Sequence, residues 1–336
     1  MRIIIVTAFL LHLTGCTSLV ADQIAHPNAM NLTFTDEQSA QEIFNLQPRK
    51  VGSLDYFYAP AAGLAQHETS FESTIKVALT NSKTGTTTTT LYHYDDSHAR
   101  KLSKQSEPRG QVIMLHSYST DSRSLYIDSR ALRAQGYDVL LLDLNGHGRA
   151  SDKPVSFGPA DVERLHHLVT LILENSDSRL LLYGKSYGAS VAAQYIAKYG
   201  NIDGFIGIAP MNDFTEAALI ETKRSSPWLT QFISDEYITA GIESAVASVG
   251  ANVEEANTAR ILDNHLKQNS WPPSLIFVGG LDKLSKKETF ISFDDNSKVK
   301  VITLPDRPHI AMMVYDNTID KQLSEWLVMF EKRKLP

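Results

Sequence analysis

Residues 180–188 read LLLYGKSYG and decide the fold class of this 336-residue chain. The apolar run at 180–183 predicts a short buried strand, and residues 189–199 have a helical pattern. Between them stands the motif G-x-S-x-G, centred on Ser186. Glycines flank the serine because bulk there would collide with neighbouring backbone in a sharp strand-to-helix turn. The stretch therefore predicts a turn that presents the Ser186 hydroxyl at a helix N-terminus as a nucleophile.

Short apolar segments recur on both sides of this stretch and alternate with helical patterns. The expected strands are 111–116, 137–143, 204–209, 274–278 and 298–304, and the expected helices include 124–135, 159–175 and 318–332. This alternation predicts an α/β fold with a mostly parallel central sheet and helices on both faces. Since such sheets hold their sites at the carboxyl ends of the strands, we looked there for partners of Ser186.

Two segments depart from the alternation. Residues 74–79 and 87–94 alternate polar and apolar side chains around a turn signal at 81–85, which predicts a β-hairpin with one wet face. Residues 211–270 contain helical patterns, including 227–240 and 242–249, but no buried strand. That segment is too long for one crossover, so we expect a small helical cap.

A serine hydroxyl needs a base that takes its proton during attack. His309 follows the last expected strand, and we expect it to be this base. The histidine in turn needs a carboxylate that fixes its tautomer. Asp282 follows the strand before and is the favoured acid, while Asp213 and Asp306 are the two rivals. The three residues thus follow one another in the order serine, acid, histidine, which is one of the known chain orders of such triads.

Five segments together give a family resemblance. They are 115–118 (LHSY), 143–148 (DLNGHG), the Ser186 elbow, 279–282 (GGLD) and His309. On these motifs the chain from about residue 69 to 332 resembles the α/β-hydrolase superfamily, and within it the monoacylglycerol lipase and serine aminopeptidase branch. The resemblance implies a Ser-His-Asp acyl-enzyme mechanism without a cofactor or metal.

The resemblance also implies an oxyanion hole and two structural histidines. The backbone N–H groups of Tyr187 and Tyr118 would form the hole, and His116 and His147 would be structural. The sequence departs from the family where Ser117 replaces a glycine, which would narrow the backbone approach at Tyr118. A second departure is the turn at 146–148, whose usual serine comes one residue late, at position 151.

The first residues resemble the signal peptide of a bacterial lipoprotein. Residues 3–13 are apolar apart from two positions, and the run is too short to cross a bilayer. The following Leu-Thr-Gly at 13–15 and Cys16 resemble a lipobox. We expect cleavage after residue 15, a lipid anchor on Cys16, a tether over 16–50 and the hydrolase domain over 51–336. Thr17 favours the outer membrane, facing the periplasm.

Composition narrows the function classes. The formal net charge of −6 gives no electrostatic reason for nucleic-acid binding. The histidines lack metal-ligand spacing, and Cys16 is the single cysteine. We expect an esterase or lipase acting on a small ester or acyl substrate. A peptidase with the same triad, or an inactive tethered binding protein, remains the alternative.

Overall fold

The computed structural model describes residues 21, 24, 37–61, 70–80, 84–97, 108–225, 232–252 and 256–332. Its strands are β1 (Gln47–Val51), β2 (Leu54–Ala59), β3 (Glu72–Thr80), β4 (Thr87–Asp95), β5 (Gly110–Leu115), β6 (Tyr137–Leu142), β7 (Leu180–Lys185), β8 (Gly204–Ile208), β9 (Ser274–Gly279) and β10 (Val299–Leu304). Its helices are α2 (Glu37–Ile43), α4 (Tyr126–Ala134), α5 (Pro159–Asn175), α6 (Tyr187–Tyr199), α7 (Phe214–Ser225), α8 (Asp235–Ser248), α9 (Thr258–Lys267), α10 (Lys287–Ile291), α11 (His309–Met312) and α12 (Asn317–Glu331), with 3-10 turns at Ser122–Leu125 and Gly148–Ala150.

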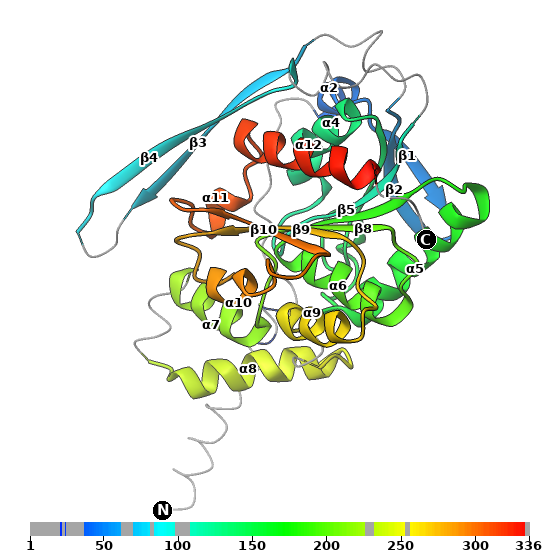
Figure 1. Ribbon diagram of the computed structural model, residues 1–336. Coiled ribbons are helices and arrows are strands. Elements are labelled where there is room, and N and C mark those ends of the chain that lie inside the picture. The colour runs from blue at the N-terminus through cyan, green and yellow to red at the C-terminus, as the bar shows by residue number, and fades with distance from the viewer. Residues whose placement is uncertain are drawn as a thin grey trace, which may run out of the picture.

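Eight of these strands form one sheet in the order β1-β2-β6-β5-β7-β8-β9-β10. The pairs from β6 to β10 are parallel, whereas β2 pairs antiparallel with both β1 and β6. Helices α5 and α6 cover one face, and α4 and α12 cover the other (Figure 1). The predicted α/β class, with a mostly parallel sheet between helices, is therefore confirmed.

The first two strands extend the sheet beyond the predicted set. The β1 strand begins at Gln47, before the expected domain boundary at residue 51, and pairs with β2. Its neighbour α2 also packs on the body, because Phe44 is buried in the core beside Tyr126. Ile24, within the expected tether, is buried as well. The body of the protein therefore includes residues upstream of position 51. The expected cleavage site and Cys16 lie outside the described residues.

The predicted hairpin is present as a separate two-stranded antiparallel sheet of β3 and β4. It projects from the body as a long arm, drawn in cyan in Figure 1. Tyr92 of β4 packs against Ala311 and Val314, which follow the predicted proton acceptor His309 along the chain. Thus the hairpin supports the outer side of α11.

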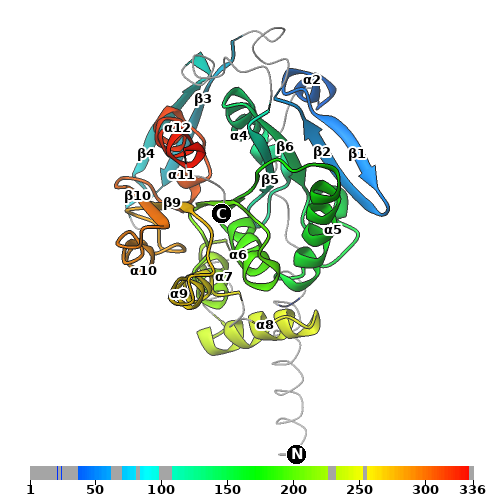
Figure 2. The ribbon, with the colours of Figure 1, turned by 45° about the vertical axis from the view of Figure 1, so that its right-hand side comes forward.

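Helices α7, α8 and α9 occupy the predicted cap segment between β8 and β9 (Figure 2). The sequence predicted two helices, 227–240 and 242–249, where the structure has α8 from Asp235 to Ser248. The prediction of a break was wrong because Gly241 lies buried inside the helix, where packing outweighs the weak helix propensity of glycine. No helix among the described residues is long and apolar enough to cross a membrane.

Candidate active site

Ser186 lies in a sharp turn between β7 and α6. Its backbone has φ +48° and ψ −110°, a strained conformation for a residue with a side chain. A Cβ on Gly184 would lie 2.4 Å from the Cα of Ala189, and a Cβ on Gly188 would lie 2.4 Å from the carbonyl oxygen of Leu115. Both glycines of the motif are therefore required, because each lets two backbone segments approach closely.

His309 and Asp282 meet the serine at the carboxyl ends of the strands. The Ser186 hydroxyl lies 3.0 Å from Nε2 of His309, and Nδ1 of the same ring lies 2.8 Å from Oδ2 of Asp282. The backbone N–H groups of Leu284 and Ser285 donate to the other Asp282 oxygen at 2.8 and 2.9 Å. The carboxylate is thus fixed on one side and directed at the imidazole on the other. With Nδ1 donating its proton to Asp282, Nε2 is left to accept the serine proton.

The rival carboxylates do not reach this histidine in the structure. Asp213 accepts a hydrogen bond from the backbone N–H of Glu216 and caps the start of α7. Asp306 is exposed on the loop before His309. Of the three candidates, Asp282 is the one that the structure joins to His309.

The loop after β5 brings Tyr118 close to the elbow. Its ring lies 6.1 Å from the Tyr187 ring, centroid to centroid. In this loop the N–H of Ser119 donates to Nε2 of His147, and the N–H of Thr120 donates to the Ser117 carbonyl. Tyr187 is the first residue of α6, where backbone N–H groups have no partner within the helix. The N–H groups of Tyr118 and Tyr187 therefore remain the candidate oxyanion donors.

Ser117, which replaces the family's glycine, is accommodated without crowding the turn. Its hydroxyl lies 3.1 Å from the Thr120 hydroxyl, and its side chain is buried. The left-handed conformation in this loop belongs instead to Ser119, with φ +60°. The loop therefore does not need glycine at position 117.

His116 and His147 brace the site rather than reach the nucleophile. His116 donates from Nδ1 to the Ser117 carbonyl and accepts the Leu144 N–H at Nε2. His147 similarly lies between the Asn145 carbonyl and the Ser119 N–H. Burial, reinforced by nearby His116, lowers the pKa of His147 to about 3. A neutral ring at position 147 is therefore part of the folded loop.

Two contacts made by the Tyr118 and Tyr187 hydroxyls were not predicted from the sequence. The Tyr118 hydroxyl donates to the backbone carbonyl of Ile24 at 2.6 Å. The Tyr187 hydroxyl donates to the buried Asp161 carboxylate at 2.9 Å, and burial raises the pKa of Asp161 above its usual value. Asp161 also accepts the N–H of Asn145, so it joins the elbow to the 143–148 turn. No sequence motif marks Ile24 or Asp161, since both act through contacts distant along the chain.

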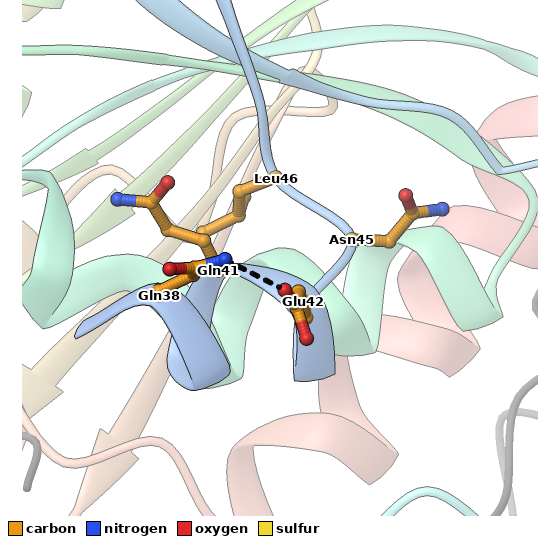
Figure 3. Close-up of a pocket in the computed structure, with 5 residues that line it drawn as sticks. All are labelled: Gln38, Gln41, Glu42, Asn45 and Leu46. Atoms are coloured by element: carbon orange, nitrogen blue, oxygen red, sulfur yellow. Dashed lines mark hydrogen bonds between the residues drawn. The ribbon is translucent and has the colours of Figure 1, made fainter. Parts of the chain in front are cut away.

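A surface hollow beside α2 lies apart from these residues (Figure 3). Its lining consists of polar side chains and one leucine: Gln38, Gln41, Glu42, Asn45 and Leu46. The Gln38 amide donates to the Glu42 carboxylate one turn further along α2. Because neither Ser186 nor His309 lines this hollow, it is not the substrate site. Within the described ranges, no cluster of histidine, cysteine and carboxylate side chains has metal-binding geometry.

Comparisons with known proteins agree with this architecture. Residues 106–257 match the family described as serine aminopeptidase, S33. An esterase of Pyrococcus furiosus, Pf2001, shares 17% identity over 92% of this chain and 98% of its own, with a TM-score of 0.54. A protein of Acinetobacter baumannii described as a putative lipase shares 16% identity over 91% of this chain and 100% of its own, with a TM-score of 0.51. No curated protein matches the chain by sequence.

A third solved structure spans nearly all of both chains. It is a membrane phospholipase A described as a bacterial virulence factor, with 15% identity, 99% coverage of each chain and a TM-score of 0.51. At such low identity these similarities establish the fold. The fold is that of the α/β hydrolases, as the sequence resemblance implied.

Proposed function

We propose that this chain, which has the α/β-hydrolase fold, is a serine hydrolase that cleaves carboxylic esters through Ser186, His309 and Asp282. The observation that carries the proposal is the unbroken relay from the Ser186 hydroxyl through the His309 ring to Asp282. In water a serine hydroxyl is a weak nucleophile, and a base held within hydrogen-bond reach makes it usable near neutral pH.

In the proposed reaction the Ser186 oxygen attacks the acyl carbon while its proton moves to Nε2 of His309. The Tyr187 and Tyr118 N–H groups stabilise the negative oxygen of the tetrahedral intermediate. His309 then returns the proton to the departing alcohol, which leaves an acyl group on Ser186. A water molecule gives its proton to His309 and attacks this ester, and the acid is released with the serine restored.

The names of three similar solved structures support ester substrates. The structures described above are called an esterase, a putative lipase and a phospholipase A. The name of the matching family favours a second candidate function, that of an aminopeptidase with the same triad. Initial rates on p-nitrophenyl esters of increasing acyl length, measured beside aminoacyl p-nitroanilides, separate these candidates.

Labelling with a fluorophosphonate tests the proposal, because the probe reacts only with an activated serine. Wild type should be labelled, with the adduct mapped to Ser186 by peptide mass spectrometry. Ser186→Ala should not react. The control His166→Ala should react like wild type, because the His166 ring stacks on Tyr199. Absence of labelling in folded wild type would support the inactive binding protein and reject the enzyme.

We further propose that the chain is exported and lipid-anchored through Cys16 in the outer membrane, facing the periplasm. The support is the sequence pattern of residues 3–16, and several acyl chains would hold the protein firmly because each buried methylene adds about 0.8 kcal/mol. Cells fed radioactive palmitate should label wild type but not Cys16→Ala. Separation of inner and outer membranes then tests the address.

A further inference from the structure

Lys185, the residue before the proposed nucleophile, is buried with its charge paired inside the protein. Its side chain is 2% exposed. The Nζ atom lies 2.7 Å from Oδ1 and 2.9 Å from Oδ2 of Asp128 on α4. Tyr183, two residues earlier on β7, donates its hydroxyl to the same carboxylate at 2.6 Å. Both side chains therefore meet α4, on the face of the sheet that α4 and α12 cover.

The same ammonium group also reaches the helix that carries His309. Lys185 Nζ donates to the backbone carbonyl of Met313 at 2.8 Å. Met313 is the C-cap of α11, whose first residue is His309. One buried cation thus connects the strand that ends at Ser186 to the far end of the short helix that begins with His309.

We infer that Lys185 is a positioning residue that keeps the His309 ring within hydrogen-bond distance of the Ser186 hydroxyl. A buried ion pair is a poor source of stability, because desolvation of two charges offsets most of their attraction. Here Lys185 donates a further hydrogen bond to the Met313 carbonyl at the end of α11. Such a bond can matter for catalysis, because a misplacement of about 1 Å between reacting groups can cost about 100-fold in rate. The inference rests on the proposed function, since it concerns the geometry of that same triad.

The test separates positioning from stability by removing the whole pair. In Lys185→Met/Asp128→Leu no buried charge is left alone, but the Tyr183 hydroxyl loses its acceptor. Tm should therefore fall moderately, whereas kcat should fall about 10- to 100-fold. KM for a p-nitrophenyl ester should change less than about 2-fold, because no contact to substrate is removed. Fluorophosphonate labelling should slow by the same factor as kcat. Lys185→Met/Asp128→Asn, which keeps an acceptor for the Tyr183 hydroxyl, is measured in parallel in case the first double variant does not fold.

Matched controls use a buried pair whose cation, Arg130, lies on the same helix, α4. Arg130 and Asp96 lie 2.9 Å apart and are as buried as Lys185 and Asp128. Arg130→Met/Asp96→Leu should lower Tm by a similar amount, because this pair also holds backbone groups of Phe71 and Ile43, but it should not lower kcat. Lys185→Arg keeps the cation and should recover at least half of the lost rate.

The inference is overturned if either double variant folds and keeps wild-type kcat. It is also overturned if kcat falls only in step with Tm, equally in the Lys185 and Arg130 series. If wild type itself neither labels nor hydrolyses esters while Tm is normal, the proposed function fails and the inference falls with it.

Discussion

The Ser186 hydroxyl and the His309 ring lie 3.0 Å apart although 123 residues separate them in the chain. The β7–α6 turn fixes the serine from below, and the short helix α11 begins at the histidine. The contact between the two side chains therefore depends on how the strained turn packs against this short helix. The predictions below test the parts that hold it.

Replacement of Asp282 by asparagine should lower kcat by about 10³- to 10⁴-fold. An asparagine amide can donate to Nδ1 of His309, which would move the ring proton to Nε2 and block proton uptake from Ser186. Tm should change little, because the Leu284 and Ser285 N–H groups still find an oxygen at position 282. Ester hydrolysis and thermal unfolding measure the two effects.

Asp213→Asn is the control for that variant. It alters the other carboxylate that follows a neighbouring strand and caps α7. Hydrolysis by this variant should stay within about 3-fold of wild type, since asparagine is also a good N-cap. A comparable loss in both variants would show that Asp282 has no special role.

Much of the fold was predictable because its central strands are uniform apolar runs. The first two strands were not predicted: β1 reads QPRKV and is largely exposed at the sheet edge, so it has no hydrophobic signal. For the site, the G-x-S-x-G context and the order of Asp282 and His309 were sufficient to select the residues that meet. Lys185 was not singled out, since its contact with Met313 depends on where α11 packs and no local pattern records that.

Gly188→Ala should be strongly disruptive. A Cβ there would lie 2.4 and 2.5 Å from the carbonyl oxygens of Leu115 and His116. Because the first atom belongs to the end of β5 and the second to the loop that follows it, either this backbone or α6 must shift. We expect a loss of about 3 kcal/mol in the free energy of unfolding, together with slow fluorophosphonate labelling.

Gly204→Ala on β8 provides the comparison. A Cβ at this position would lie 3.0 Å from the ring edge of Phe330. Because this neighbour is a side chain, it can turn to make room. Urea denaturation should give a loss of about 1 kcal/mol or less, and labelling should be normal. Equal losses at the two glycines would argue against close backbone contact at the elbow.

Stability should fall as the pH drops below about 6.5, in part through His147. Its pKa is lowered from 6.5 to about 3 in the folded protein, first by burial and then by His116. Between these values the unfolded chain binds a proton that the folded chain does not, so acid favours unfolding. The stability contributed by the neutral ring is fully present well above pH 6.5. About 2 kcal/mol of this free energy of unfolding is lost by pH 5.

Urea denaturation of His147→Gln at pH 7.5 and pH 5 checks this. A glutamine oxygen can still accept the Ser119 N–H that His147 accepts in the wild type. The variant should lose about 2 kcal/mol less than wild type between the two pH values. If both proteins lose the same amount, His147 is not the group that titrates.

Ile24→Ala tests whether the segment before α2 belongs to the folded body. Ile24 is 7% exposed and packs in the same core cluster as Tyr187 and Phe214, and its carbonyl accepts the Tyr118 hydroxyl. Truncation of a buried isoleucine should cost about 2–4 kcal/mol of unfolding free energy. Ile43→Ala is chemically identical but 52% exposed, so it should cost less than about 0.5 kcal/mol. If the two variants prove equally stable in urea, Ile24 contributes nothing to the core. The residues around it would then be the tether that the sequence predicted.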